Sequence, residues 1–292
     1  MQSPVQLDQI QVLGVVGAGQ MGNGIAQVAA GTGYKVIVVD VNQESLEKGK
    51  KAIETSCDRL IKKSLFNEEQ KKSLLSNITW QTDLKAMENV DVAIEAASEN
   101  LDLKLKIFKN LDQVVKPQAL LCSNTSSISI TKIAAATHRP GQVCGMHFMN
   151  PVPLMKLVEG IRGLQTTDAT FNTIKLLSEK LGKVFVESTK DMPGFIVNRI
   201  LMPMINEAVY TLHEGIATVE AIDEAMHLGT NQPMGPLTLA DFIGLDTCLA
   251  IMNVLYDGFS DSKYRPCPLL VKYVEAGWLG KKSGRGFYNY DK

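Results

Sequence analysis

The stretch Val12–Ala30, "VLGVVGAGQMGNGIAQVAA", decides the fold of this chain. It joins a short β-branched run, Val12–Val16, to a glycine-rich turn and then to an apolar segment with helical spacing. Gly17, Gly19 and Gly22 form a G-x-G-x-x-G pattern directly after the strand and at the start of the helix. In that context the pattern is typical of the first strand, turn and helix of a Rossmann-type sheet that binds a dinucleotide.

Each glycine of this pattern has a separate physical role. Gly17 permits the tight turn, Gly19 lets the backbone approach a pyrophosphate, and Gly22 lets the helix pack closely on the strand. The N–H groups and the positive end of the helix then attract the phosphates. Gln20 and Met21 lie in the same turn, so we expect all five residues to contact a cofactor. A glycine-rich turn without a ligand is the alternative interpretation.

The first two thirds of the chain alternate short β-branched runs with longer helical patterns, which predicts an α/β fold with a doubly wound parallel sheet. Apolar residues at helical spacing between Asn42 and Phe66 predict one long helix that projects beyond the sheet. The predicted strands are Val12–Val16, Lys35–Asp40, Ile78–Gln81, Val90–Ala96, Ala119–Ser123 and Val143–His147.

The pattern changes near Lys190, after which the chain is helical without convincing strand pairs. We therefore expect a Rossmann-type cofactor-binding domain over residues 1–189 and an all-α domain over residues 190–292. A long helix is expected to begin near Pro193 and to end at Gly215. Pro203 lies inside that segment and predicts a kink or a break.

Asp40 ends the second predicted strand, about 20 residues beyond the glycine pattern, where a carboxylate accepts hydrogen bonds from an adenine ribose. A carboxylate at this position repels a 2′-phosphate, and the next residues, Val41, Asn42 and Gln43, include no arginine to bind one. The sequence therefore favours NAD over NADP.

The segment "HFMNPVPLMKLVEG" begins with His147 and carries Glu159 near its end. Histidine is a suitable base for taking a hydroxyl proton while hydride leaves the same carbon, and it needs an acceptor on its second ring nitrogen. Pro151 and Pro153 favour a reversal that would bring the two ends side by side. The sequence thus predicts a His–Glu pair, with a core histidine and a surface glutamate as the alternative.

Composition excludes several other classes of function. The 292 residues carry a formal net charge of -1, which gives no electrostatic basis for binding nucleic acid or an anionic membrane. The 5 cysteines and 4 histidines show no spacing typical of a metal site, so no metal is expected. No apolar segment approaches the length of a membrane span and no targeting signal opens the chain, which favours the cytoplasm.

Six motifs, in this order, resemble those of the L-3-hydroxyacyl-CoA dehydrogenases, and the likeness to the bacterial 3-hydroxybutyryl-CoA enzymes is greatest. The resemblance covers the chain from about residue 10 to its end and is carried by "GAGQMGNGIA", "SNTSSISI", "HFMNPVPLMKLVEG", "KDMPGFIVNRI", "GPLTLADFIGLD" and "GKKSGRGFYNY". It implies a Rossmann-type domain, a helical domain that mediates a homodimer, and reversible NAD-dependent oxidation of an (S)-3-hydroxyacyl-CoA to the 3-ketoacyl-CoA.

The resemblance also implies roles for individual residues. His147 would be the catalytic base and Glu159 its orienting partner, while Ser126 and Asn198 would bind the substrate hydroxyl and carbonyl region. The adenosine half of the cofactor would meet Asp40, Glu99 and Lys104, and the nicotinamide half would lie nearer Ser126 and Asn150. Lys282 in the C-terminal tail would be a further contact to the cofactor. Coenzyme A would contact Ser56 and Lys63.

Simpler interpretations remain open for several of these residues. Ser126 and Asn198 could be helix caps or turn residues, and Lys63 and Lys282 could be solvated surface charges. Two other functions are also compatible with the fold: a dehydrogenase of a free 3-hydroxy acid or sugar acid, and a crystallin-like structural protein.

Overall fold

The structure, a computed structural model, describes residues 4–290 and divides into two compact units between Asp191 and Met192. The first unit is built on an eight-stranded sheet of order β3-β2-β1-β4-β5-β6-β7-β8. All neighbouring strands are parallel except β6 and β7, which are antiparallel. The strands are β1 Val12–Val16, β2 Lys35–Val39, β3 Ile78–Gln81, β4 Val92–Glu95, β5 Leu120–Ser123, β6 Val143–Phe148, β7 Leu157–Ile161 and β8 Val184–Ser188.

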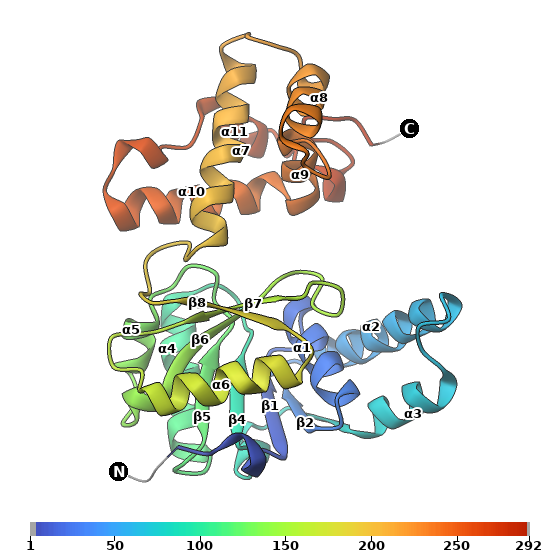
Figure 1. Cartoon of the computed structure of the whole chain (residues 1–292), viewed down its shortest axis with the longest axis vertical. Coiled ribbons are helices and arrows are strands. Elements are labelled where there is room, and N and C mark those ends of the chain that lie inside the picture. The colour runs from blue at the N-terminus through green and yellow to red at the C-terminus, as the bar shows by residue number, and fades with distance from the viewer. Residues whose placement is uncertain (1–3, 291–292) are drawn as a thin grey trace. The chain divides into compact units, whose positions relative to one another are not determined.

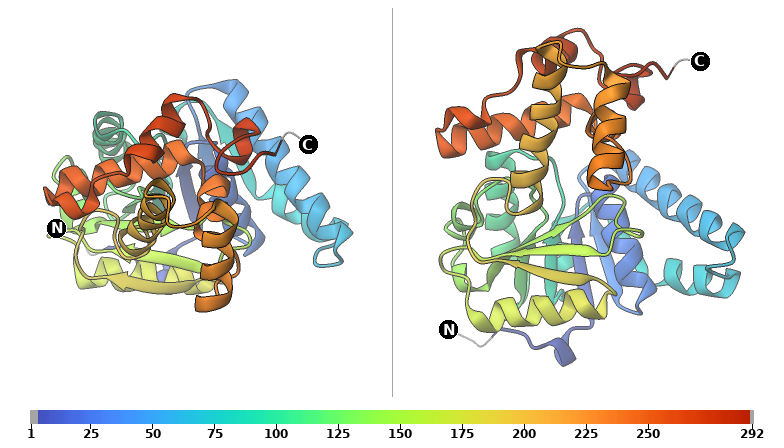
Figure 2. Two further views of the ribbon diagram at one scale, coloured as in Figure 1. Left: turned by 90° about the horizontal axis from the view of Figure 1, so that it is seen from above. Right: turned by 45° about the horizontal axis from the view of Figure 1, so that its top comes forward.

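Helices cover both faces of this sheet, as the α/β alternation in the sequence predicts (Figures 1 and 2). On one face, Ile25 of α1 and Phe171 of α6 share a single buried core with Leu13 and Val15 of β1. Strand side chains alternate between faces, so the intervening residues of each strand point toward α4 and α5. The helices of this unit are α1 Gln20–Gly31, α2 Gln43–Lys62, α3 Glu68–Ser76, α4 Leu101–Val114, α5 Ile130–Ala134 and α6 Asp168–Lys180.

The expected long helix after Asp40 is present as α2, which extends away from the sheet with α3 beside it (Figure 1). Asn42 caps its start, since its side-chain oxygen accepts from the N–H of Glu44. The helix ends at Lys62, four residues earlier than expected, and Ser64 then adopts a positive φ of 56°. This left-handed residue turns the chain back toward α3.

All six predicted strands are present, with ends that differ by no more than two residues. The sheet nevertheless contains two more strands, β7 and β8, that the sequence pattern did not reveal. β8 lies at the edge of the sheet, and Val184 and Val186 are exposed there, so its apolar pattern does not mark a buried face.

The second unit is helical, in agreement with the pattern after Lys190. Its core joins α7, α9 and α10 through buried apolar side chains such as Ile205, Leu237 and Met252. The helices are α7 Val197–His213, α8 Val219–Thr230, α9 Pro236–Ile243, α10 Leu245–Phe259 and α11 Pro268–Glu275.

Pro203 and Pro193 give two expectations for α7. The helix is continuous through Pro203, so of the kink or break expected there, the break is absent. Proline removes one main-chain hydrogen bond, but Met202 and Ile205 are buried on either side of it and hold the helix in the core. The start is also later than Pro193 suggests, because Gly194 and Phe195 both take positive φ values, 73° and 49°, and form a turn before Val197.

Among the described residues, no single helix is long and apolar enough to cross a membrane. In the same described part of the chain, α9 and α10 together have the length and apolar composition of a span, but the pair is bent by 97°.

The packing at Gly22 generates a first prediction. A Cβ added there would lie 1.9 Å from the carbonyl oxygen of Gly17, whereas a Cβ added at Gly19 would meet nothing within 4 Å. Because main chain cannot yield as a flexible side chain does, we expect Gly22→Ala to lower the free energy of unfolding by about 1–3 kcal/mol. Urea unfolding of the two alanine variants measures this, with Gly19→Ala as the matched control. Equal stability of both variants would contradict the packing role of Gly22.

Candidate active site

The glycine turn has the geometry that binding of a pyrophosphate requires. Gly17 takes a φ of 101° and its N–H donates to Val39 O at 2.8 Å, which fixes the turn between β1 and α1. No side chain caps α1 at Gly19, and the space beside that residue is open to a Cβ. The backbone N–H groups of the first turn of α1 are therefore suited to an anionic ligand.

Asp40 follows β2 and reaches the glycine turn. One carboxylate oxygen accepts from the N–H of Ala18 at 2.9 Å, and the other accepts from the N–H of Asn42 at 3.1 Å. Asp40 therefore orders the turn between Gly17 and Gly19. It also places a negative charge at the carboxyl end of β2, where a ribose is bound in this class of fold.

Gln20 and Asn150, which are 130 residues apart, lie together. The Gln20 amide Nε2 donates to Asn150 Oδ1 at 3.1 Å. This bond connects the start of α1 to the segment that follows β6, so the glycine turn and the His147 segment border the same edge of the sheet.

His147 and Glu159 form the pair that the sequence predicts. They are register partners in the antiparallel β6–β7 pair, and His147 Nδ1 lies 2.8 Å from Glu159 Oε2. Met146 and Phe148 belong to the core shared with α1 and α6, so the His147 ring points to the other face of the sheet. Both side chains are buried, which strengthens the electrostatic interaction between them. The expected reversal after His147 is confirmed.

Lys183 holds the segment between these two strands. Its ammonium donates to the carbonyl oxygens of Val152 at 2.5 Å and Met155 at 2.8 Å. Burial lowers the pKa of Lys183. The lysine thus fixes the turn that carries Asn150 and brings β7 back beside β6. It was missed in the sequence because nothing in its neighbourhood marks it as buried.

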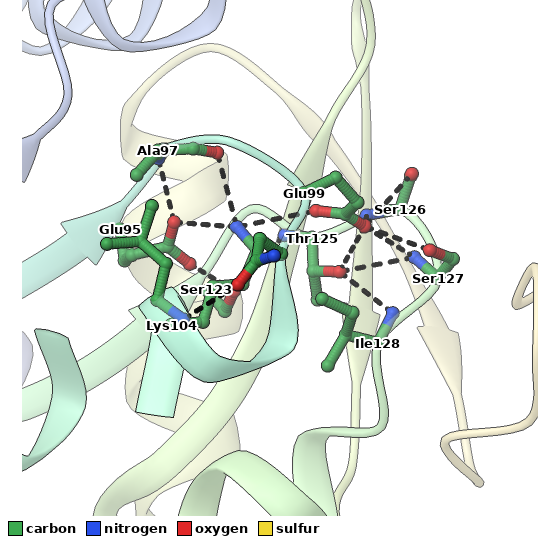
Figure 3. Close-up of polar contacts among 11 residues, drawn as sticks. Glu95, Ala97, Glu99, Lys104, Ser123, Thr125, Ser126, Ser127 and Ile128 are labelled. Atoms are coloured by element: carbon green, nitrogen blue, oxygen red, sulfur yellow. Dashed lines mark hydrogen bonds and ion pairs between the residues drawn. The ribbon is translucent and has the colours of Figure 1, made fainter. Parts of the chain in front are cut away.

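Ser126 lies in the loop after β5, against Glu99 (Figure 3). Glu99 Oε1 accepts from the N–H of Ser126 at 2.9 Å and from that of Ser127 at 3.1 Å. Burial alone would raise the pKa of Glu99, but the Lys104 ammonium and hydrogen bonds from Thr125, Ser127 and Ser126 outweigh it, and the net pKa is lowered. Glu99 is a carboxylate held by its loop rather than a freely mobile side chain.

The resemblance groups Glu99 and Lys104 with Asp40 in the adenosine half of the cofactor site, and that grouping stays a prediction. In the structure Glu99 is hydrogen-bonded to Ser126. Asp40 follows β2, whereas Glu99 follows β4, and β1 lies between those strands. Lys104 is fully buried, and its ammonium lies 3.3 Å from Glu99 Oε2.

The proposed coenzyme A residues lie on α2. Ser56 is partly buried near the middle of the helix, and Lys63 is its exposed C-terminal cap. They are seven positions apart, which places both on one side of the helix. A ligand could therefore contact both residues.

Asn198 and Lys282 belong to the second unit. Asn198 is the second residue of α7. Lys282 Nζ lies 2.6 Å from Asp246 Oδ1, at the start of α10. Nearby, the buried Asp241 accepts hydrogen bonds from the N–H groups of Phe287 and Tyr288. The "GKKSGRGFYNY" motif therefore folds the tail back onto the α9–α10 corner.

No group of three or more metal-ligating side chains occurs among residues 4–290. All five cysteines are free and buried.

Comparison with known proteins places this site in a family. The NAD binding domain of 3-hydroxyacyl-CoA dehydrogenase matches residues 12–192, and the C-terminal domain of 3-hydroxyacyl-CoA dehydrogenase matches residues 194–290. A 3-hydroxybutyryl-CoA dehydrogenase of Bradyrhizobium diazoefficiens is 58% identical over 281 residues, 96% of each chain. A probable 3-hydroxybutyryl-CoA dehydrogenase of Bacillus subtilis is 56% identical over 284 residues, 97% of this chain and 99% of the relative.

A solved structure gives the same result. The (S)-3-hydroxybutyryl-CoA dehydrogenase of Ralstonia eutropha is 53% identical and superposes with a TM-score of 0.93, covering 97% of this chain and 100% of its own. Family models thus account for both compact units, and similar relatives match nearly the full length. The chain belongs to the 3-hydroxyacyl-CoA dehydrogenase family, with the NAD-binding domain of that family in its first part and the family's C-terminal domain in its second.

Proposed function

We propose that this protein oxidises a short-chain (S)-3-hydroxyacyl-CoA, such as 3-hydroxybutyryl-CoA, reversibly to the 3-ketoacyl-CoA with NAD. The observation that carries the proposal is the buried hydrogen bond of 2.8 Å between His147 and Glu159, in a chain of this dehydrogenase family. Relatives above 50% identity that are named for this substrate support the choice of acyl chain.

The reaction needs a proton acceptor beside the carbon that loses hydride. His147 uses Nδ1 in the bond to Glu159, so the proton of the substrate hydroxyl passes to Nε2. Glu159 keeps the ring in the required tautomer and stabilises the imidazolium as it forms. Ser126 and Asn198 orient the hydroxyl and carbonyl region of the substrate. When bound, NAD supplies the acceptor for the hydride.

The residues around the cofactor region fit a dinucleotide. The open space at Gly19 admits the pyrophosphate, and Asp40 is an acceptor for the ribose hydroxyls. Gly17, Gly22, Gln20 and Met21 shape this turn, and Asn150 borders it through Gln20. Glu99 borders the part of the cofactor site that contains Ser126, and Lys282 contributes to cofactor binding from the C-terminal tail. Ser56 and Lys63 contact coenzyme A along α2.

A direct assay tests the proposal. Purified protein with (S)-3-hydroxybutyryl-CoA and NAD should reduce the cofactor, and the rate should fall as the acyl chain is lengthened. Free (S)-3-hydroxybutyrate should be a poor substrate, because it lacks the coenzyme A contacts. Saturation by the free acid would favour a dehydrogenase of free hydroxy acids, and no turnover of any substrate would favour a structural protein.

A double-mutant cycle tests the catalytic pair. His147→Gln should lower kcat by about 10²- to 10⁴-fold, the usual effect of losing a positioned base. Glu159→Gln can still bond the ring but cannot stabilise its charge, so kcat should also fall. Binding of NAD should be unchanged in both variants, as measured by calorimetry.

Because the pair acts as a unit, the double variant should be scarcely slower than His147→Gln alone. Additive losses would mean that the two residues act independently, and the proposed dyad would have to be abandoned.

Cofactor choice depends on Asp40. Asp40→Asn removes the charge that repels a 2′-phosphate but keeps an oxygen for the N–H of Ala18. We expect the preference for NAD over NADP to fall by about 1–3 kcal/mol, the worth of a charged hydrogen bond. Ratios of kcat/KM for the two cofactors measure this. Wild-type protein that already used NADP as well as NAD would contradict the assignment.

We also propose that residues 190–292 mediate a homodimer and contribute to substrate binding, while residues 1–189 bind the cofactor. Exposed apolar side chains of the second unit, Ile200, Ile216, Leu228 and Phe242, support an interface there. Light scattering at micromolar concentration should therefore give twice the chain mass of 31.9 kDa. A species of the single-chain mass would exclude a stable dimer. The cytoplasmic location stays a prediction.

A further inference from the structure

A buried carboxylate with no role in the proposed reaction ends β4. Glu95 is 0% exposed, and its two oxygens accept three hydrogen bonds (Figure 3). Oε1 accepts from the N–H of Ala97 at 2.7 Å and from Lys104 Nζ at 2.6 Å, and Oε2 accepts from Ser123 Oγ at 2.6 Å. A fully buried charge needs such partners, since removing it from water is otherwise expensive.

Lys104 links this carboxylate to a second one. Lys104 is also 0% exposed as a residue, and its ammonium contacts Glu95 Oε1, the carbonyl oxygen of Ala97 at 3.3 Å and Glu99 Oε2 at 3.3 Å. One cation therefore lies between two anions. Of these anions, Glu95 is inside the protein and Glu99 is partly exposed.

The other oxygen of Glu99 holds the loop that carries Ser126. Oε1 accepts from both N–H groups of Ser126 and Ser127, and from the hydroxyls of Ser126 at 3.3 Å and Ser127 at 3.0 Å. With Oε2 directed to Lys104 and Oε1 directed to the loop, the Glu99 carboxylate is held on both sides. Its orientation determines where the Ser126 hydroxyl lies.

This network occupies the same face and edge of the sheet as the His–Glu pair. Glu95 and Ser123 are register partners in β4 and β5, and Ser123 is in turn paired with Gly145 of β6, two residues before His147. Asn124 directly follows Ser123, and its side-chain oxygen accepts a hydrogen bond from the N–H of Phe148 at 2.8 Å. The loop that carries Ser126 is thus attached to β6 immediately after His147.

We propose that Glu95 is a positioning residue for the dehydrogenase reaction, acting through Lys104 and Glu99 to fix the hydroxyl of Ser126. The inference rests on the proposed role of Ser126 in binding the substrate hydroxyl. Glu95 itself touches no substrate. Lys104 has the same positioning role, which accounts for a lysine that is fully buried near a cofactor site.

The charges explain why Glu95 matters to Glu99. With Glu95 neutral, Glu99 remains as the carboxylate that the buried ammonium contacts, and it is drawn toward Lys104 and away from the loop. With both Glu95 and Lys104 neutral, that pull is absent, but Glu99 also loses the cation that directs Oε2. Either change releases Ser126 from its present orientation.

Two variants distinguish an effect of Glu95 on the position of Ser126 from an effect on the stability of the protein. Glu95→Gln alone leaves a buried ammonium short of a partner and should lower the melting temperature. Glu95→Gln combined with Lys104→Met removes both charges and should recover much of that loss. We expect kcat to remain about 10- to 100-fold below wild type in both variants, because a reacting group is misplaced, and we expect a smaller change in KM. Amide hydrogen exchange at Ser126 and Ser127 should be faster in both.

The opposite end of the same strand offers a matched control. Asp91, just before β4, lies 2.7 Å from Lys116 Nζ and accepts from the N–H groups of Gln11 and Val12, both at 2.9 Å. Asp91→Asn combined with Lys116→Met should lower stability but leave kcat and exchange at Ser126 and Ser127 unchanged.

Recovery of wild-type kcat in the Glu95→Gln/Lys104→Met variant, or an equal kcat loss in the Asp91 control, would overturn the positioning role. Wild-type protein inactive on every hydroxyacyl-CoA would instead refute the proposed function. In that case hydrogen exchange still decides whether Glu95 controls the loop: unchanged exchange at Ser126 and Ser127 refutes the connection, and faster exchange supports it.

Discussion

The antiparallel return of β7 beside β6 is the constraint on which the site depends. A base that ends a buried strand needs a carboxylate that is buried as well, and a parallel neighbour would bring that carboxylate from a distant part of the chain. The reversal instead aligns His147 directly with Glu159, and register partners on one face of a sheet are within hydrogen-bonding reach. Lys183 holds the connecting segment from inside.

The remaining polar residues collect where parallel strands end. Asp40, Glu95 and Ser123 lie at or next to the carboxyl ends of β2, β4 and β5. In a doubly wound sheet this edge also holds the glycine turn and the start of α1, so ligand-binding groups from distant parts of the sequence meet there. The hydrogen bond between Gln20 and Asn150 shows this convergence over 130 residues.

Much of this was predictable because it depends on local pattern. Val12–Val16 and the three glycines specify a strand, a turn and a helix within a few residues, and Pro151 and Pro153 mark the reversal after His147. β8 was missed for a physical reason: it is an edge strand, and its valines Val184 and Val186 are exposed. Pro203 does not break α7, because tertiary packing holds the helix together through a residue that weakens an isolated helix.

Glu95 was not predictable at all. In "VDVAIEAASEN" it follows an apolar run, as a solvated residue at a strand end would. Its burial depends on Lys104 from α4 and Ser123 from β5, which the fold brings together. Residue type and spacing indicate a side chain's chemistry, but partners from three elements decide whether it is buried.

The two carboxylate sites of this edge face different side chains, a lysine in one and a histidine in the other, and that difference suits their proposed tasks. Lys104 Nζ lies 2.6 Å from Glu95 Oε1 and 3.3 Å from Glu99 Oε2, so one side chain ties both carboxylates together beside the loop that carries Ser126. Glu159 instead faces His147, the proposed acceptor of the substrate proton, so its carboxylate stabilises the imidazolium as that forms. The first arrangement favours a rigid loop, and the second favours the appearance of positive charge on His147 when the substrate loses its proton.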